Sequence, residues 1–444
     1  MSISFDYRWA RLFGYLRYRG AVRAPSRAPA GRPAAGISLV IPSRNGRELL
    51  AAQLPGIARE LAGFAHEILV VDNGSDDGTA GWLGEAWPQV LVDVSPEPLS
   101  FARAVNRGIE AARFTHVCLL NNDMLLDPDF FAPLVLAFDR IPNLFCSTAQ
   151  IRFPPGVRRE ETGKAVLTLE DPEAFPVRCD TPLAGEDQTW VLYGSGGCSL
   201  YDAAKLRALG SLDVAYDPAY VEDLDVGYRA WQRLWPSVYV AGSVVEHRHR
   251  ATTSRYYTRQ GLDNILEINY LTFLVRAVYS RRLFRRLWAH ALRRLRARAP
   301  HDPAAGNALS QAGLIAARGA TAQPPSEPEE MFLALTSGAV AVFPGGGANP
   351  SRKPDLLVAR PALAEAPPPG DAGQVLVALT GKLSTPPPEV LAVYAEVVLV
   401  RGEDAFRAAL RQTIRKWGIG KVRLEGGAMQ EYAADCAPAR IDFA

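Results

Sequence analysis

Three short segments of the chain concentrate side chains that could bind a ligand or transfer a proton. They are residues 72–79 (DNGSDDGT), 121–123 (NND) and 221–225 (VEDLD). The first two follow β-branched or apolar runs that are typical of buried strands. Polar groups directly after the strands of a parallel sheet lie at the edge where such sheets bind their ligands.

The first segment offers a hydrogen-bond acceptor for a nucleoside. The carboxylate of Asp72 can accept hydrogen bonds from a nucleobase or a ribose, and Gly74 and Gly78 permit a tight turn. A turn whose Ser, Asp and Thr side chains cap the following helix explains the same residues equally well. Both interpretations place Asp72 at the end of a strand.

The second segment contains one carboxylate, Asp123, that could hold a divalent cation. Mg²⁺ and Mn²⁺ commonly take one or two protein carboxylates and complete their shells with diphosphate oxygens and water. Because Asn and Asp terminate strands in many proteins, the tripeptide alone also fits a simple strand end.

The third segment places three carboxylates, Glu222, Asp223 and Asp225, within four positions. Since like charges repel, at least one of these groups should have a raised pKa or face a cation, as is typical of a general base. The alternative is an acidic helix start that the helix dipole favours, in which Asp225 and Arg229 form an i,i+4 pair.

Two further segments could contribute to a site. The run Gly194-Ser195-Gly196-Gly197 lacks large side chains, so its backbone could approach a substrate, although the same pattern fits an ordinary turn. His247 and His249 follow an apolar run at alternate positions and would share one face if the strand continues. A histidine is more often structural than a ligand, so both roles stay open.

The regular alternation of short apolar runs with helix-compatible stretches predicts the framework that positions these residues. Four such runs, ISLVIP, EILVVD, QVLVDV and HVCLLN, occur within about 100 residues and imply a mostly parallel sheet with helices on both faces. Composition marks the remaining boundaries. We expect a basic amphipathic segment and linker at 1–36, an α/β domain at 37–255, an Arg-rich helical segment at 256–300, a linker at 301–330 and a small α/β domain at 331–444.

Composition also excludes several classes of protein. The 444 residues are 48% hydrophobic and 22% charged with a net charge of +2, which suits a globular chain and gives no basis for nucleic-acid binding. Five scattered cysteines predict buried thiols in a reducing compartment. No run resembles a signal peptide or a transmembrane helix, so we expect a cytoplasmic protein that could also lie on the inner face of the cytoplasmic membrane.

Taken in order, seven segments resemble the family 2 inverting glycosyltransferases with the GT-A fold, in particular the rhamnosyltransferase-like branch of bacterial surface polysaccharide synthesis. They are ISLVIPSRNG, VDNGSDDGT, SFARAVNRGIEAA, CLLNNDMLLDPDF, GSGGCSLYDAAKLRALGSLD, YVEDLDVGYRAW and VVEHRHRATTS. The resemblance covers about residues 37–255. It implies a nucleotide-sugar-binding domain with a mostly parallel twisted sheet flanked by helices, followed here by the small carboxy-terminal α/β unit.

The resemblance also implies roles for individual residues. The expected catalytic pair is Glu222 and Asp223, with Asp223 as the base, and the metal-binding DXD motif falls on 121–123 with Asn in place of the first carboxylate. A later metal-associated histidine falls on His247 or His249, and the cation would be Mn²⁺ or Mg²⁺. The expected donor contacts are Pro42, Ser43, Asn45, Asp72, Asn73, Asn106, Asn122, Gly196 and Gly197.

The implied activity is metal-assisted, inverting transfer of a hexosyl or rhamnosyl group from a dTDP- or UDP-sugar to a glycan or a lipid-linked acceptor, as in lipopolysaccharide synthesis. The QxxRW motif of processive members is missing, because the chain reads QRLW at 232–235, so one or a few sugars would be added. Two alternatives are a degenerate scaffold that binds nucleotide-sugar or glycan, and a nucleotidyltransferase. The turn after the first strand, PSRNGREL, lacks the glycine- and lysine-rich phosphate loop of the latter.

The segment between Glu267 and Asp302 contains no carboxylate and interleaves arginines with apolar residues. Such a basic amphipathic helix could either bind an anionic membrane surface or present a solvated face while it packs on the protein. A similar pattern of Arg, Trp, Leu and Phe at residues 8–17 favours the membrane interpretation.

Overall fold

The structure is a computed structural model that describes residues 3–15, 33–154, 162–248, 256–318, 324–347, 354–359, 373–425 and 427–443. His249 lies outside the described residues, as do Leu16 and Arg17 at the end of the basic amino-terminal segment.

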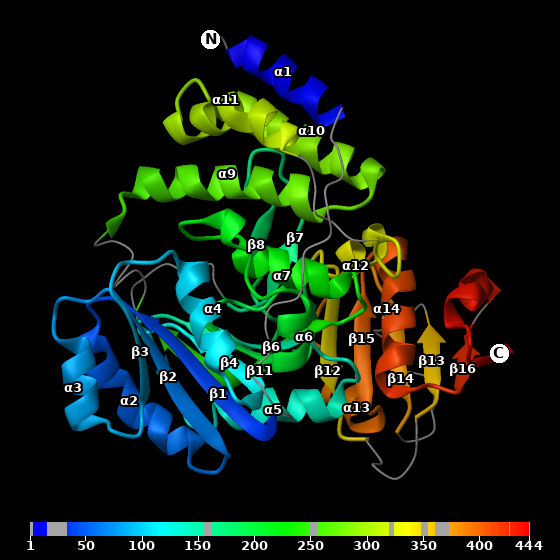
Figure 1. Ribbon diagram of the computed structural model, residues 1–444. Coiled ribbons are helices and arrows are strands. Elements are labelled where there is room, and N and C mark those ends of the chain that lie inside the picture. The colour runs from blue at the N-terminus through cyan, green and yellow to red at the C-terminus, as the bar shows by residue number, and fades with distance from the viewer. Residues whose placement is uncertain are drawn as a thin grey trace.

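The four predicted strands form one half of a large sheet (Figure 1), in which they pair in parallel in the order β3-β2-β1-β4. The interiors of β1, β2 and β4 are buried on both faces, as expected of a sheet covered by helices, whereas β3 is the edge strand and leaves Leu91 and Val94 exposed. The strands are β1 (Ala34–Ser43), β2 (His66–Asn73), β3 (Leu91–Ser95) and β4 (Phe114–Leu120), and the helices between them are α2 (Arg47–Leu61), α3 (Thr79–Ala86) and α4 (Phe101–Ala111).

The other half of the sheet mixes strand directions. It contains β5 (Met124–Leu126), β6 (Cys146–Arg152), β9 (Trp190–Val191), β10 (Cys198–Asp202) and β11 (Ser237–His247). Strand β10 runs antiparallel between β4 and β6, β11 runs parallel to β6, and β5 and β9 run antiparallel to β11. Within the described residues, six of the nine strands therefore point the same way, and the predicted mostly parallel sheet is confirmed.

Shorter elements surround this half. They are α5 (Phe131–Arg140), α6 (Ala203–Ala208), the 3₁₀ turn η1 (Val214–Tyr216), α7 (Glu222–Trp231) and the antiparallel pair β7 (Ala165–Leu167) and β8 (Val177–Cys179). Helix α7 begins with the third acidic segment, so the helix start that the sequence offered as one of two interpretations is confirmed.

Four helices stack over this domain, with α9 nearest the sheet, α10 and α11 above it and α1 outermost (Figure 1). They are α1 (Ile3–Tyr15), α9 (Arg259–Ala277), α10 (Arg281–Arg298) and α11 (Pro303–Ala317). Helix α11 corrects the predicted linker at 301–330. Asp302 caps it by accepting the N–H groups of Ala304 and Ala305, and its alanines pack against α1 and α9. The sequence reads as a linker because these small residues form no strong apolar stripe without their partner helices.

The carboxy-terminal unit is α/β, as predicted, and its strands follow the order β12-β15-β14-β13-β16-β17. These are β12 (Val340–Pro344), β13 (Leu356–Ala359), β14 (Val375–Leu379), β15 (Glu396–Val400), β16 (Lys421–Leu424) and β17 (Arg440–Phe443), with α12 (Glu329–Leu335), α13 (Pro388–Val393), α14 (Glu403–Trp417) and η2 (Gly427–Cys436).

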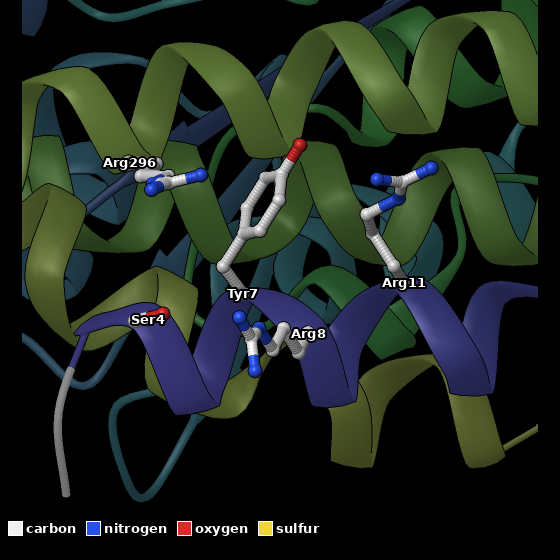
Figure 2. A pocket seen from close by; sticks show the side chains of 5 residues that line it. All are labelled: Ser4, Tyr7, Arg8, Arg11 and Arg296. Carbon is white, nitrogen blue, oxygen red and sulfur yellow. The ribbon is translucent and has the colours of Figure 1, made fainter.

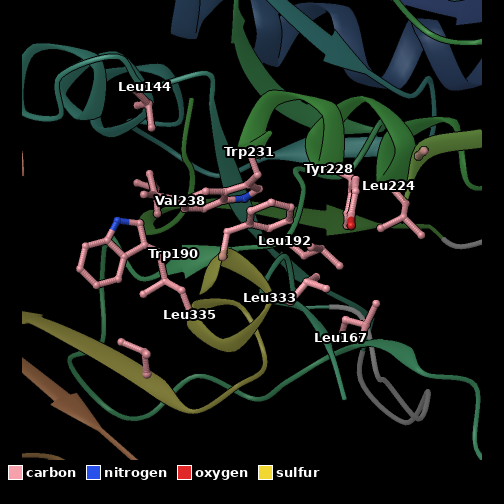
Figure 3. Packing of buried hydrophobic residues seen from close by; sticks show 14 of the residues in the cluster. Leu144, Leu167, Trp190, Leu192, Leu224, Tyr228, Trp231, Val238, Leu333 and Leu335 are labelled. Atoms are coloured by element: carbon pink, nitrogen blue, oxygen red, sulfur yellow. The ribbon is translucent and has the colours of Figure 1, made fainter. Parts of the chain in front are cut away.

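One apolar core joins the two sheets. Leu333 and Leu335 of α12 pack among Trp190, Leu192 and Trp231 of the first domain (Figure 3). Across the part of the chain that the structure describes, no helix is both long enough and apolar enough to cross a bilayer.

Candidate active site

The carboxyl ends of β1, β2 and β4 bring together five of the residues predicted to contact the nucleotide-sugar donor. Ser43 lies opposite Asp72 in the β1–β2 register, and the Asn122 side chain donates a hydrogen bond to the Ser43 hydroxyl at 2.9 Å. Asn45, which has a positive φ of 49°, accepts the N–H of Asp76 through its side-chain oxygen at 2.8 Å. Pro42 precedes this turn at the end of β1 and is half-buried.

The hydrogen bonds of Asp72 favour the simpler of the two interpretations that the sequence left open. Its carboxylate is buried and accepts the N–H of Ser75 at 3.2 Å, so it shapes the turn after β2. The N–H of Asn45 in turn donates to the Ser75 hydroxyl at 2.9 Å. Asp72 therefore holds the turn whose Ser75 contacts the end of β1, and a contact of Asp72 with a nucleoside stays a prediction.

Asn73 and Asn106 use their side chains to hold loops. Asn73 exchanges two hydrogen bonds with the backbone of Leu99, at 3.0 and 2.6 Å. Asn106 on α4 does the same with the backbone of Leu212, at 2.8 and 3.0 Å. Both amides thus position segments beside the site, and neither is brought into the cluster around Ser43.

Asp123 and His247 lie side by side. Asp123 directly precedes β5, and His247 is the last residue of β11. His247 pairs with Met124 in the β5–β11 register, and its Nε2 lies 3.5 Å from Oδ1 of Asp123. That carboxylate oxygen is buried and accepts no hydrogen bond from the described residues. A buried carboxylate oxygen beside an imidazole nitrogen fits a divalent cation, since further ligands can come from diphosphate and water.

Of the two candidate histidines, the described residues bring His247 to Asp123. The adjacent backbone supports the arrangement, because the N–H of Arg248 donates to the carbonyl of Asp123 at 2.9 Å. His249 lies outside the described residues, so its role stays a prediction. The described residues contain no group of three or more His, Cys, Asp or Glu side chains that could hold an ion by themselves.

Glu222 and Asp223 open α7 after a turn in which Tyr220 and Val221 both adopt positive φ, 70° and 80°. Such values are costly for a β-branched residue and occur where surrounding structure imposes them. Asp223 is half-buried, and its Oδ2 accepts the N–H of Gly196 at 3.2 Å. The turn therefore directs Asp223 toward the glycine-rich segment.

The two neighbouring carboxylates have different environments. Glu222 is buried, and this burial, together with the negative charge of Asp223, holds the pKa of Glu222 well above its usual value. The raised pKa expected from carboxylate crowding is therefore on Glu222. Asp225 forms the alternative pair, because Arg229 donates to it at 2.7 Å, and it also accepts the Tyr216 hydroxyl at 3.0 Å.

The glycine-rich segment connects the two acidic motifs. Gly196 donates to Asp223, while the carbonyl of Gly197 accepts the N–H of Asn121 at 2.9 Å. A Cβ at Gly197 would lie 2.6 Å from the side-chain amide nitrogen of Asn121, so a larger residue would have to displace that side chain. The segment brings the end of strand β4 close to helix α7, which leaves both motifs at one edge of the sheet. An approach of its backbone to a substrate stays a prediction.

Two positioning residues were not predicted from the sequence. Gln53 on α2 donates to the carbonyls of both Asn121 and Met124, at 2.7 Å each, and so fixes the turn that carries Asp123. Asn269 on α9 donates to the carbonyls of Tyr216, Ala219 and Tyr220 in the loop before α7. A polar residue on the buried face of each predicted helix was the signal available in the sequence.

Comparison with known proteins agrees with this arrangement. The profile of glycosyltransferase-like family 2 matches residues 33–262, and the chain belongs to this family. With six of nine described strands parallel and the acidic motifs at their carboxyl ends, the GT-A fold predicted from the sequence is confirmed.

Individual relatives are distant. An uncharacterized protein of Sinorhizobium fredii, y4gI, is 28% identical over 125 residues, which are 27% of this chain and 14% of that one. An N-acetylglucosaminyl-diphospho-decaprenol L-rhamnosyltransferase of Mycobacterium tuberculosis is 26% identical over 212 residues, 42% of this chain and 68% of that one. TarS 1–349 of S. aureus, solved with UDP-GlcNAc, has a TM-score of 0.44 at 14% identity, over 62% of this chain and 81% of that one.

Proposed function

We propose that this protein transfers a sugar from a nucleotide-sugar donor, a dTDP- or UDP-sugar, to a hydroxyl group of a growing glycan or a lipid-linked acceptor in cell-surface polysaccharide synthesis. The transfer inverts the anomeric configuration and is not processive. The observation that carries the proposal is the junction at Gly196 and Gly197, where one backbone segment contacts both Asp223 and the turn that leads to Asp123.

Asp223 is the proposed general base. Its carboxylate is half-buried and is oriented by the Gly196 N–H, so it can take the proton of an acceptor hydroxyl while that oxygen attacks the anomeric carbon from the face opposite the nucleotide. Glu222 is less suited to this role, because burial and the charge of Asp223 raise its pKa and so disfavour its charged form. A single direct displacement of this kind inverts the configuration.

Asp123 and His247 would hold Mg²⁺ or Mn²⁺. When bound, the cation supplies positive charge that offsets the negative charge of a departing diphosphate. The residues around Ser43, Asn45 and Asn122 would orient the nucleotide at the ends of β1 and β4.

The lipid-linked acceptor is supported by the Mycobacterium tuberculosis relative, whose name describes a diphospho-decaprenol substrate.

The proposed non-processive action rests on the missing QxxRW motif, in whose place the chain reads QRLW from Gln232. The amide of Gln232 donates to the carbonyl of Ala277 at 2.8 Å and to Glu329 at 2.9 Å, so it has a packing role within the described structure.

A thermal-shift screen with dTDP-, UDP- and GDP-sugars, each with and without Mn²⁺, tests the proposal. One nucleotide-sugar should raise Tm, and Mn²⁺ should increase the effect, because ligands that bind the native state stabilise it. The same donor should be hydrolysed slowly when no acceptor is present. The nucleoside diphosphate that this hydrolysis releases measures its rate. A donor that raises Tm without hydrolysis or transfer would instead identify a binding scaffold.

The Asp123→Ala variant tests the cation site in the same screen. It should lose the Mn²⁺-dependent part of the shift and most transfer activity, since no second carboxylate of its segment can replace Asp123. Asp139→Ala, on the exposed face of α5, is the matched control and should respond as the wild type does. An unchanged Mn²⁺ response in Asp123→Ala would refute the assignment.

A further inference from the structure

A basic pocket lies far along the chain from the acidic motifs, between α1 and α10. It has a volume of about 400 Å³ and is lined by Ser4, Tyr7, Arg8, Arg11 and Arg296. Figure 2 shows the ring of Tyr7 standing between Arg11 and Arg296, whose guanidinium lies 4.8 Å from the ring centre. Among the described residues, no carboxylate forms an ion pair with these three arginines.

The chemistry of this pocket favours a phosphate group. Guanidinium groups donate several hydrogen bonds in a planar fork that matches phosphate oxygens, and the Ser4 hydroxyl can add another donor. The surrounding helices carry little opposing charge. Helix α1 contributes two arginines and one acid, Asp6, α10 contributes eight arginines and no acid, and α11 has no charged residue.

An exposed apolar stripe adjoins the pocket on α1. Phe5, Trp9 and Leu12 are each 48% exposed and occur at i, i+4 and i+7, so they share one helix face. On α11, which packs against α1, Leu314 is 65% exposed, the largest value among the large apolar residues described. Gly313 beside it faces the Trp9 ring, so the two helices present one continuous apolar surface.

The structure decides between the two roles that the sequence left open for the Arg-rich segment. Leu283, Phe284, Leu287 and Trp288 on α10 are buried, so the apolar side of α10 packs on the protein. Three arginines of the Arg-rich segment form ion pairs within the protein. Arg276 on α9 binds Asp213, and Arg294 and Arg298 on α10 bind Glu267. Helix α1, with its exposed stripe, is therefore the element that remains available to a membrane.

We infer that the face formed by α1, α11 and the outer side of α10 docks on a bilayer of anionic phospholipid, with the stripe in the interface and a lipid phosphate in the basic pocket. Apolar side chains beside arginines are typical of helices that lie in the plane of a membrane interface. A second copy of the chain fits less well, because two faces rich in arginine would repel each other.

The docked orientation would have a consequence for the proposed transfer. Helix α9 lies between this face and the sheet (Figure 1), and its Asn269 holds the loop before Asp223. The docking face and the catalytic loop are thus joined by one rigid helix, which suits an acceptor that remains in the membrane. This last step rests on the proposed function, whereas the docking itself does not.

Vesicle flotation tests the inference on the full-length protein. Wild type should float with vesicles of phosphatidylcholine mixed with phosphatidylglycerol, float less at high salt, and stay behind with phosphatidylcholine alone. Arg8→Gln/Arg11→Gln/Arg296→Gln should lower the partition coefficient about a hundredfold, since each arginine near anionic lipid contributes about a factor of five. Arg401→Gln/Arg423→Gln/Arg440→Gln, the same charge change on exposed positions of the carboxy-terminal unit, should float as wild type does.

The apolar part is tested by Phe5→Ser/Trp9→Ser and, on a different helix, by Leu314→Ser, with Leu136→Ser as the exposed control on α5. Both variants should weaken flotation, and circular dichroism checks that each is folded. Donor hydrolysis in solution should be unchanged in every variant, so docking and catalysis fail separately. Wild type that stays soluble at low salt, or that binds only inorganic phosphate in the pocket, would overturn the inference.

Discussion

Asp223 and Glu222 are adjacent in the chain, yet their surroundings assign them different chemistry. Asp223 faces the glycine-rich segment and is partly open to solvent, whereas Glu222 points into the protein and has an Oε2 atom with no hydrogen-bond partner among the described residues. A carboxyl group that is buried beside another carboxylate favours its neutral form. A strongly perturbed pKa on a carboxyl group beside a second carboxylate is a common feature of active sites.

At this scale we predict that Asp223→Asn keeps donor binding but lowers kcat by about a hundredfold or more, as loss of a general base does. Glu222→Gln should cost less, because glutamine keeps the shape of the side chain and the raised pKa of Glu222 already disfavours a negative charge at this position. Donor binding is measured by thermal shift and turnover by single-turnover transfer. A larger loss in Glu222→Gln would move the base to Glu222.

The raised pKa of Glu222 also predicts how stability depends on pH. Below its usual pKa, Glu222 is protonated in both the folded and the unfolded state. As the pH rises, the unfolded chain releases the proton first. The folded protein therefore loses stability until the pH passes the raised pKa of the folded state. The free energy of unfolding of Glu222→Gln, relative to that of wild type, should therefore increase with pH above about pH 4.5, by up to about 1.4 kcal/mol per pH unit. Urea unfolding at several pH values measures this difference.

Glu85→Gln is the control for that series, since Glu85 is exposed on α3. Its unfolding curve should follow wild type at every pH. If Glu222→Gln also follows wild type, then Glu222 ionises in the folded protein as it does in the unfolded chain, and the difference between the two carboxylates is smaller than its burial implies.

At the scale of elements, helix α9 is the support of the catalytic loop. Asn269 is buried and donates hydrogen bonds to three carbonyls of that loop, at 2.7, 2.9 and 3.1 Å, and Arg276 binds Asp213 just before it. The loop contains the two residues with positive φ that lead into α7. Contacts from α9 thus offset the local strain that orients Asp223.

We predict that Asn269→Ala lowers the free energy of unfolding by about 1–3 kcal/mol, because buried carbonyls lose their donor, and lowers kcat more than it raises KM. The KM-against-kcat comparison separates loss of orientation from loss of donor binding. Asn264→Ala, on an exposed turn of the same helix where Asn264 bonds to Asn307, should change neither quantity by much. Equal kcat in both variants would show that α9 does not position the loop.

For the whole molecule, Glu329 connects the carboxy-terminal unit to the catalytic helix. It is fully buried at the start of α12 and accepts hydrogen bonds from the Tyr228 hydroxyl at 2.7 Å and from the Gln232 amide at 2.9 Å, both on or next to α7. The N–H groups of Tyr279 and Ser280, between α9 and α10, also donate to it. Four donors from two segments therefore meet one carboxylate.

We predict that Glu329→Ala destabilises the protein by at least about 2–3 kcal/mol, because it leaves several buried donors unsatisfied. Glu330→Ala changes the adjacent exposed carboxylate and should have little effect. Since one apolar core spans both sheets, urea should unfold wild type in a single transition when followed by fluorescence and by circular dichroism. Separate transitions for the two sheets would contradict this coupling.

The sequence by itself determined the strands of the first half-sheet and the place of the first two acidic motifs after them, because apolar periodicity and strand-end residues are local signals. It offered the helix start at Glu222 as one of two interpretations. It also predicted a raised pKa among three crowded carboxylates. Only the tertiary structure decided that Glu222 is the buried one, that His247 lies beside Asp123, and that Asn106 holds Leu212. Helix α11 and the ion pair of Arg294 with Glu267 could not be predicted from the sequence either, because each depends on contacts between segments that are distant in the chain.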